Sequence, residues 1–249
     1  MRLRTTLSVA ALALAAILAG CDRAPGDAKI DEYTPPDQVT DFHTLYATNC
    51  QACHGANGQG GPAMDLGNPE YQALVDDATL KKWISNGMPG TEMPAFAQSA
   101  GGMLTDQQVD AIAAGMRREW RKPNVFGGET PPPYAQPDGG NAAHGQQVYQ
   151  ARCASCHQNP GRQQVTSPVY LSLVSDQALR TIIVAGRPDI GQPDWRLRPT
   201  PAPGSPPAVY AYLVGPPLAS QDVTDLVTYL HSLRSPSAVS AAPTKPAQQ

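Results

Sequence analysis

The sequence is poor in the side chains that usually fill a protein core. Of its 249 residues, 6% are aromatic and 16% are charged, whereas proline occurs 26 times and glycine 22 times. A chain of this length can form two small domains, but this composition excludes one large hydrophobic core. The sequence also lacks an excess of basic residues, since its formal net charge is −3. Proteins that bind nucleic acid carry such an excess, so we expect no nucleic-acid partner.

A long apolar run is also missing from the N-terminal segment. The uncharged stretch Leu7–Gly20 has fourteen residues, whereas a membrane-spanning helix needs about 20. It follows Arg2 and Arg4, as in the signal peptide of an exported protein. The residues Leu18-Ala-Gly-Cys21 resemble a bacterial lipobox, which implies removal of residues 1–20 and a lipid on the sulfur of Cys21. The alternative is an ordinary secretory signal with an incidental cysteine.

A lipid anchor predicts the location of the mature protein. Asp22 resembles the signal that retains such lipoproteins in the inner membrane, so we expect a lipid-anchored protein on the periplasmic side of the bacterial inner membrane. Residues 21–36 contain proline, aspartate and glycine without periodicity. This composition is typical of a flexible tether, here one that carries the lipid.

Cysteine is rare, and its positions carry the chemistry. Of the five cysteines, Cys21 belongs to the signal, and the other four form two Cys-x-x-Cys-His motifs. These are Cys50, Cys53 and His54, and Cys153, Cys156 and His157. This motif attaches c-type haem: two thiols bond to the vinyl groups, and the histidine ligates the iron. The sequence therefore predicts two covalently bound haem c groups.

Three other interpretations of the cysteine pairs were considered. A thioredoxin-like redox pair and exported disulfides do not require a histidine after each pair. A zinc site built from both pairs would have to join residues 103 positions apart, whereas the usual spacing is about 15 to 20 residues. The doubled histidine therefore favours haem.

The two motifs belong to an internal repeat. Leu80–Phe96 aligns without a gap with Leu179–Trp195, and a leucine, an isoleucine, a glycine, two prolines and the final aromatic residue match. An amphipathic stretch precedes each haem motif, and a helix follows each aligned segment. The first of these later helices begins with the capping-box pattern Thr105-Asp-Gln-Gln108, and the second runs from Ser220 to Leu233. The residues that mark the early helices are Val39, Phe42, Leu45 and Tyr46 in the first copy and Val148 and Tyr149 in the second.

On these residues the sequence resembles a pair of class I c-type cytochrome domains. The resemblance implies an all-α fold with two tandem domains, each holding one haem between an N-terminal helix and a loop that supplies the sixth iron ligand. We place domain one at residues 37–122 and domain two at 141–235, joined by a Pro/Gly-rich linker at 123–140. A Pro-rich insertion occupies 198–217 of domain two, and residues 236–249 read as a disordered tail.

The resemblance also implies that the first and last helices of each domain cross where a small residue faces an aromatic one. In domain two these residues are Gly145 and Tyr229, and in domain one the sizes are reversed, so we expect Phe42 to contact Gly115. Short helices in domains of about 90 residues are marginally stable. A covalently held haem would supply the missing apolar core, which predicts a largely unfolded apoprotein.

The axial ligands distinguish the two haems. Proximal His54 is expected to be paired with Met93, because the repeat gives Met93 the proline-flanked position and aligns its competitor Met88 with Arg187. The remaining methionines are predicted to be packing residues. They are Met64, Met103 and Met116.

Domain two has no methionine, because every methionine lies at or before position 116. Its ligand position holds Gln192, whose amide oxygen is a weak donor for ferrous haem. Three possibilities stay open opposite His157: Gln192 coordinates weakly, the sixth position is open, or His231 or His144 binds instead. We favour a weak or open sixth position, which predicts a lower potential than in domain one and reactivity towards small ligands.

Several neighbouring residues have expected supporting roles. Pro62 and Pro168 resemble the family position whose carbonyl accepts the proximal histidine N–H. Phe96 and Trp195 are expected to line the haem, and Arg196 and Arg198 are either propionate partners or solvated loop charges. Arg196 follows Trp195 directly, and Arg198 lies three positions after Trp195.

These features together predict a membrane-anchored dihaem carrier of single electrons, not an enzyme. Its expected partners are redox proteins such as an oxidase, a reductase or a soluble cytochrome, within or beside a membrane respiratory complex. The alternatives are a peroxidase-like haem enzyme or a ligand sensor that uses an open position on the second haem. No acid or base side chain is recognisable beside that position, and the site must decide the function.

Overall fold

The computed structural model describes residues 34–159, 164–198 and 215–234. The chain divides into two compact units, Met1–Gln38 and Val39–Gln249. In the first unit the described residues contain a short 3-10 turn, η2 (Pro36–Gln38). The predicted signal, Cys21, most of the tether, most of the Pro-rich insertion and the tail lie outside the described residues. In the parts that are described, no helix is both long enough and apolar enough to cross a membrane.

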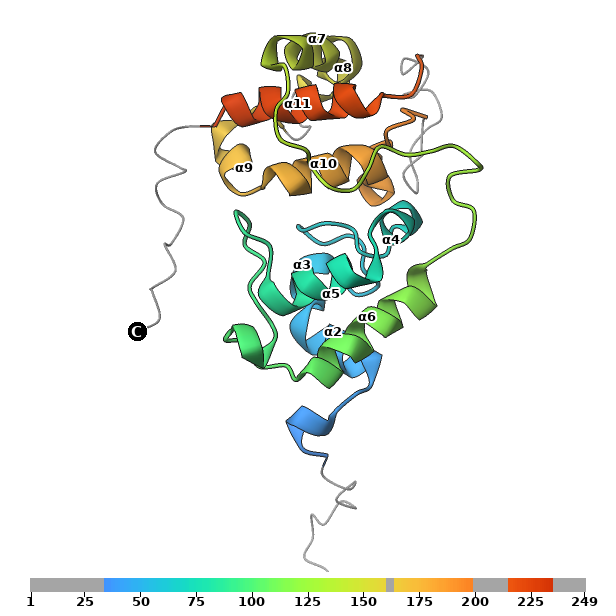
Figure 1. The fold of residues 1–249 in the computed structure, drawn as a ribbon, viewed down its shortest axis with the longest axis vertical. Coiled ribbons are helices and arrows are strands. Elements are labelled where there is room, and N and C mark those ends of the chain that lie inside the picture. Colours follow the sequence, from blue (N-terminus) through green and yellow to red (C-terminus); the bar gives the residue numbers. More distant parts are fainter. Residues whose placement is uncertain (1–33, 160–163, 199–214, 235–249) are drawn as a thin grey trace, which may run out of the picture. The chain divides into compact units, whose positions relative to one another are not determined.

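Domain one is built from helices, as predicted (Figure 1). The described residues of the chain contain isolated β-bridges but no strand. The elements of domain one are α2 (Phe42–Asn49), α3 (Gln51–His54), α4 (Pro69–Leu74), α5 (Asp77–Asn86), η3 (Gln98–Ala100) and α6 (Asp106–Trp120). The capping box at the start of α6 is confirmed, since Thr105 Oγ1 accepts from Gln108 N at 3.3 Å and Gln108 Oε1 accepts from Thr105 N at 3.1 Å.

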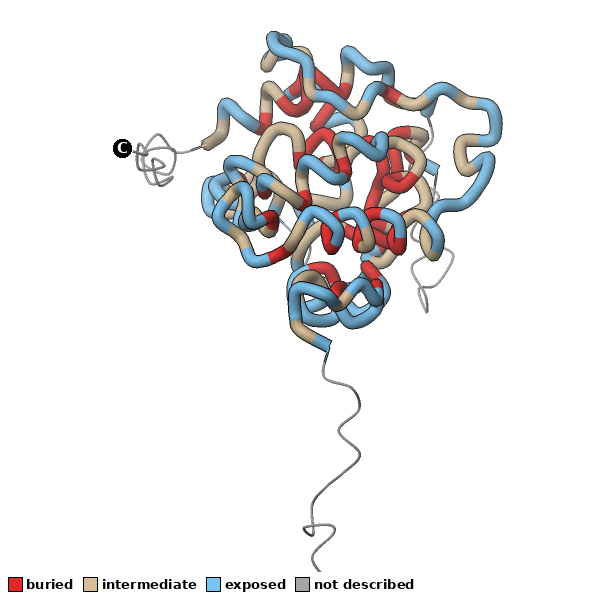
Figure 2. Tube along the Cα trace, turned by 60° about the horizontal axis from the view of Figure 1, so that its bottom comes forward, coloured by how far each residue is buried: buried red, intermediate tan, exposed pale blue. Residues whose placement is uncertain are grey.

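Domain two repeats the order of the α-helices. Its elements are α7 (Ala142–Arg152), α8 (Ala154–His157), α9 (Pro168–Ser172), α10 (Asp176–Ala185), η4 (Pro188–Ile190) and α11 (Ser220–Ser232). Each domain has a hydrophobic cluster between its first and last helices, and buried positions alternate with exposed ones along the chain (Figure 2). The all-α fold with two tandem cytochrome-like domains is therefore confirmed.

The crossing of α2 and α6 follows the prediction. A Cβ atom placed on Gly115 would lie 2.2 Å from Cγ and Cδ2 of Phe42, so the ring of Phe42 packs directly on the glycine. In domain two the atoms nearest to a Cβ on Gly145 belong to the backbone of α11, with the carbonyl oxygen of Asp225 at 1.9 Å. Tyr229 packs instead on Tyr149, with ring centroids 5.7 Å apart. The two domains thus fill the same crossing differently.

The repeat extends further than the sequence alignment. The aligned segments Leu80–Phe96 and Leu179–Trp195 are 99 residues apart. Pro69 begins α4 and Pro168 begins α9, so the same offset of 99 residues already applies to these two helices. The haem motifs are offset by 103 residues, which makes the loop between the motif and the next helix four residues longer in domain one. Pro168 therefore corresponds to Pro69 and not to Pro62.

The loops after α5 and α10 share one backbone hydrogen bond between equivalent residues. Met88 N donates to Met93 O at 3.2 Å, and Arg187 N donates to Gln192 O at 2.9 Å. Both helices end at a glycine with positive φ, 69° at Gly87 and 72° at Gly186, where a side chain would be strained. The same loop thus follows both helices, and it presents Met93 in one domain and Gln192 in the other.

The linker contacts both domains. Tyr134 Oη accepts a hydrogen bond from Trp83 Nε1 of domain one at 2.8 Å, and its carbonyl accepts from Gln177 Nε2 of domain two at 2.7 Å. One prediction about packing is wrong: Met103 is 80% exposed, because it lies in the turn just before Thr105. Met116 is buried in the core, as expected.

Candidate haem sites

The first haem motif lies in the short helix that follows α2. Cys50 N donates to Tyr46 O at 2.9 Å, and His54 N donates to Cys50 O at 3.0 Å. Residues three and four positions apart share one side of a helix, so this turn brings both cysteines and His54 to the same side. That is the arrangement needed to bond one flat cofactor at two thiols and ligate its iron.

The ring of His54 is held for metal binding. His54 is buried, and its Nδ1 lies 2.8 Å from the carbonyl oxygen of Met64, to which it donates. This hydrogen bond leaves Nε2 for the iron. Burial lowers the pKa of His54, and this favours the neutral ring that binds a metal. The sequence predicted that the carbonyl of Pro62 accepts the hydrogen bond from His54. The carbonyl of Met64 accepts it instead, because the longer loop of domain one brings Met64, two residues later, next to the histidine ring.

The second haem motif repeats this geometry. Cys153 N donates to Tyr149 O at 2.9 Å, and His157 N donates to Cys153 O at 3.0 Å. His157 Nε2 lies 3.1 Å from Oε1 of Gln192. The ring nitrogen that would bind iron therefore faces the residue at the predicted sixth-ligand position.

The other candidates for the sixth ligand lie elsewhere. Nδ1 of His231 is 2.9 Å from Asp176, and its side chain is 57% exposed. Nδ1 of His144 is 2.8 Å from Asp225, and its side chain is 43% exposed. Of the three residues considered, Gln192 is thus the one that the structure places on His157. Met93 is half-buried in its loop and stays the predicted sixth ligand of the first haem.

The motif cysteines are free thiols in the structure. The four motif cysteines form no disulfide. Within the described ranges, no group of three or more His, Cys, Asp or Glu side chains is arranged to hold a metal ion. Burial raises the pKa of Cys50 and of Cys153 to about 12, whereas thioredoxin-like redox pairs contain a thiol of lowered pKa.

A buried polar atom near the second site also fits a bound cofactor. Nε1 of Trp195 is buried and has no hydrogen-bond partner among the residues that the structure describes. A buried indole N–H usually has an acceptor, and the carboxylates of a haem are suitable acceptors. Trp195 lies three residues after Gln192, at the expected haem wall. The residues present therefore fit a covalently bound haem.

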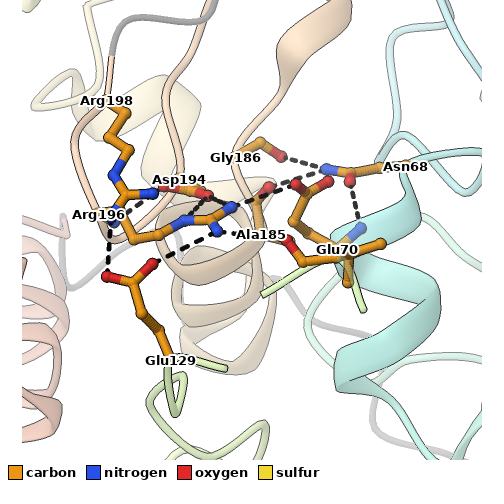
Figure 3. A network of polar contacts seen from close by, with 9 residues as sticks. Asn68, Glu70, Glu129, Ala185, Gly186, Asp194, Arg196 and Arg198 are labelled. Carbon is orange, nitrogen blue, oxygen red and sulfur yellow. Dashed lines mark hydrogen bonds and ion pairs between the residues drawn. The ribbon is translucent and has the colours of Figure 1, made fainter. Parts of the chain in front are cut away.

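Polar contacts between the two domains were not anticipated from the sequence. Asn68 Nδ2 donates to Ala185 O at 2.8 Å and to Gly186 O at 3.2 Å, which caps the end of α10. Oδ1 of Asn68 accepts from Glu70 N at 2.8 Å at the start of α4. Figure 3 shows Asn68 between these partners. Nothing in the local sequence distinguishes this buried asparagine from an ordinary helix cap.

Arg196 belongs to the same region, and its partners are carboxylates of the protein, neither solvent nor a free position for a propionate. It pairs with Asp194 of its own loop, with Glu70 of domain one at 3.3 Å, and with Glu129 of the linker at 3.7 Å (Figure 3). Its side chain is 10% exposed. Arg198 pairs with the same Glu129 at 2.9 Å.

Comparison with known proteins agrees with the structure. Residues 37–114 match the family model of the cbb3-type cytochrome c oxidase subunit III, and residues 142–234 match the model of cytochrome c. A dihydro-heme d1 dehydrogenase of Pseudomonas aeruginosa is 40% identical over 70 residues, which are 28% of this chain and 13% of that protein.

Two further relatives match longer parts of the chain. The cbb3-type cytochrome c oxidase subunit CcoP of Azospirillum is 30% identical over 46% of this chain and 37% of its own length. The cytochrome bc1 complex cytochrome c subunit of Mycobacterium bovis is 29% identical over 65% of this chain and 59% of its own length. The chain thus spans less than two thirds of these curated relatives. Both halves match cytochrome c models and have the helical architecture with the haem motif in place, and the chain therefore belongs to the class I c-type cytochrome family.

Proposed function

We propose that the protein is a dihaem electron carrier that moves single electrons between redox partners. The observation that carries this proposal is the doubled site: each domain presents two cysteines and a histidine on one helical turn, and in domain two this histidine faces Gln192. Bound haem supplies a reversible one-electron change at iron. The chain supplies attachment, the orientation of His54 through Met64, and a different sixth-ligand position in each domain.

The assignments of the binding residues follow from these sites. Cys50 and Cys53 attach the first haem, and Cys153 and Cys156 attach the second. His54 and Met93 ligate the first iron, and His157 ligates the second, with Gln192 as a weak sixth ligand. A thioether raises the potential of haem, so the first haem has the higher potential and an electron passes from the second haem to the first.

The partners and location form the less direct part of the proposal. Relatives named as subunits of a cbb3-type oxidase and of a bc1 complex support membrane respiratory partners. The lipobox-like residues before Cys21 support attachment to the periplasmic side of the bacterial inner membrane. We expect Cys21→Ser to release the protein into the soluble periplasmic fraction, whereas the parent protein stays with the membrane.

The test measures coordination and turnover in the same holoprotein. A carrier takes up two electrons in two one-electron steps and does not consume hydrogen peroxide. We expect CO to bind one reduced haem of the parent protein and both haems of Met93→Ala, whereas Gln192→Met binds none. Peroxide turnover that Gln192→Met abolishes would identify the second haem as a catalytic site and overturn the carrier proposal.

A second candidate function uses the same weak ligand. The amide of Gln192 facing His157 leaves the second haem accessible to a small molecule, as a peroxidase-like enzyme or a ligand sensor would require. The relative named as a dehydrogenase gives this alternative some support. Peroxide consumption identifies the enzyme. CO binding without turnover, and with no transfer of electrons to a soluble cytochrome, identifies the sensor.

A further inference from the structure

One arginine joins the two haem sites. Arg187 lies two residues after the end of α10, and its side chain is 9% exposed. Its Nη1 donates to the carbonyl of Ala63 at 2.7 Å, and its Nη2 donates to the carbonyl of Gly61 at 3.1 Å. Both carbonyls belong to domain one, in the loop that follows the first haem motif.

That loop is bound to the first haem motif. Ala63 N donates to the carbonyl of Cys53 at 3.0 Å. The next carbonyl, of Met64, accepts from Nδ1 of His54 at 2.8 Å. Arg187 therefore holds the peptide unit that precedes the one orienting the proximal histidine of the first haem.

The backbone of Arg187 belongs to the second site. Arg187 N donates to Gln192 O at 2.9 Å, and Gln192 N donates to Arg187 O at 2.9 Å. This pair of hydrogen bonds closes the loop whose Gln192 side chain faces Nε2 of His157 at 3.1 Å. The position of Arg187 and the position of Gln192 cannot change independently.

The guanidinium is itself fixed on both sides. Its Nε donates to Oδ1 of Asp189 at 2.8 Å, and its Nη2 donates to Oδ2 at 2.7 Å. The same Oδ2 accepts from Gly60 N of domain one at 3.1 Å. The corresponding residue of domain one, Met88, has no polar side-chain group and cannot form such a clamp.

We infer that Arg187 is a positioning residue that couples the axial ligation of the two haems. A change in the loop around Gln192 moves the Arg187 backbone, and its guanidinium transmits that change to the carbonyls beside the His54 acceptor. This inference rests on the proposed function, because it assumes that both motifs carry haem. Coupling between two sites is reciprocal, so a change at the first haem also reaches the second.

The inference depends on the shape of the side chain and not only on its charge. Arginine presents five N–H donors in a planar fork, whereas lysine presents one ammonium group that cannot reach four oxygens in these directions. Arg187→Lys therefore keeps the charge and breaks the clamp. The chain contains a matched control in Arg196, which is equally buried, pairs with a carboxylate two residues away and also contacts domain one.

The experiment compares Arg187→Lys with Arg196→Lys in the holoprotein. Electron paramagnetic resonance of the oxidised protein reports the axial geometry of each haem, and Met93→Ala assigns the two signals. We expect Arg187→Lys to change the g-values of both haems and Arg196→Lys to change neither. A result in which Arg187→Lys leaves the first haem unaltered overturns the inference.

A second measurement tests the coupling directly. CO at the second haem should change the ratio of reduced to oxidised first haem, at fixed applied potential, by about fivefold or more in the parent protein. In Arg187→Lys we expect less than about a twofold change. If Arg187→Lys does not fold, Asp189→Asn releases the guanidinium while retaining Arg187 and should weaken the coupling in the same direction. Equal coupling in the parent and the variants overturns the inference.

The two proposals fail in different ways. One haem per chain, or turnover of peroxide, contradicts the proposed carrier, whatever the arginine variants do. Two haems with one-electron titrations and identical spectra in the parent and Arg187→Lys support the carrier and reject the coupling.

Discussion

The two ligand loops share a backbone hydrogen bond between equivalent residues but carry different side chains. The loop after α5 carries Met88 and Met93, and the loop after α10 carries Arg187 and Gln192 in the same positions. Domain one thus has a thioether at the position of the proposed sixth ligand, whereas domain two has an amide there and uses the other position for contact with domain one. The shared hydrogen bond places Met93 and Gln192 at equivalent positions of their loops. The type of side chain then determines how strongly each could bind iron.

The helix crossings show the same relation between a shared frame and different packing. In domain one Gly115 of the last helix contacts the ring of Phe42. In domain two Gly145 of the first helix contacts the backbone of the last helix at Asp225. A ring can shift by rotating, whereas a helix backbone moves only with its whole helix. The helix crossing of domain two should therefore tolerate a larger side chain in place of its glycine less well than the crossing of domain one.

The largest effect is expected from removal of one haem. Cys153→Ala combined with Cys156→Ala should leave one haem per chain and unfold domain two, because haem binding supplies folding free energy. The loss in free energy of unfolding should equal the net stability of domain two, about 5 kcal/mol or more. Far-UV circular dichroism and the haem-to-protein ratio measure it. A cooperative unfolding transition of a haem-free domain two would contradict it.

The crossings predict a difference between two glycine substitutions. Gly145→Ala should destabilise domain two by about 3 kcal/mol, because its Cβ meets backbone. Gly115→Ala should cost about 1 to 2 kcal/mol, and adding Phe42→Leu should recover part of that loss. Chemical denaturation of the holoprotein measures both. Equal costs, or no interaction between the two domain-one substitutions, would refute the distinction.

The longer loop of domain one contains a buried carboxyl group, that of Asp65. Burial, with a contribution from Asp189, raises the pKa of Asp65 from 3.8 to about 7, and Arg187 opposes the rise. The folded protein therefore binds this proton more tightly than the unfolded chain, so the contribution of Asp65 to stability falls as pH rises from about 4 to 7 and stays lost above 7.

Replacement of Asp65 should remove this dependence. At pH 8 we expect Asp65→Asn to raise the free energy of unfolding by about 2 kcal/mol, roughly half of what the shift allows, because the amide needs its own partners. Near pH 4 the advantage should vanish. Denaturation at a series of pH values measures the difference between variant and parent, and a constant difference across this range would exclude the mechanism.

The cap residues of α4 and α9 offer a matched comparison between the domains. Asn68→Ala leaves the carbonyls of Ala185 and Gly186 without their donor and should cost about 2 kcal/mol. The corresponding Ser167 makes no side-chain capping bond, so Ser167→Ala should change stability by less than about 0.5 kcal/mol. Thermal unfolding measures both, and similar losses would mean that the contact between the domains contributes nothing.

The smallest expected effects concern the last helices. Thr105 completes a capping box at the start of α6. At the start of α11 the N–H of Ala219 donates to Asp222 at 2.9 Å, but the alanine side chain cannot accept a hydrogen bond from the helix backbone. Thr105→Ala should therefore cost about 1 kcal/mol, and Ala219→Thr should gain a similar amount. Denaturation midpoints test the pair, and changes of the same sign would contradict the reasoning.

Some local features were predictable because their signals are short in sequence. The Cys-x-x-Cys-His spacing and the capping box of Thr105 each follow from a few side chains, and the contact of Phe42 with a small residue follows from the resemblance to class I cytochromes. The exposed position of Met103 was not predictable, because a methionine in a turn has no periodicity that assigns it to a face. The acceptor for His54 was also missed, since the length of its loop determines which carbonyl arrives there.

The sequence by itself determined the covalent chemistry, the repeat, the helices and the difference between Met93 and Gln192. These depend on residue types and spacings within one domain. Only the tertiary structure decided that Met64 orients His54, that Asn68 caps a helix of the other domain, and that Arg187 joins the two sites. Those contacts connect residues 10, 117 and 124 positions apart, and they form where packing excludes water and each buried polar group must find a partner.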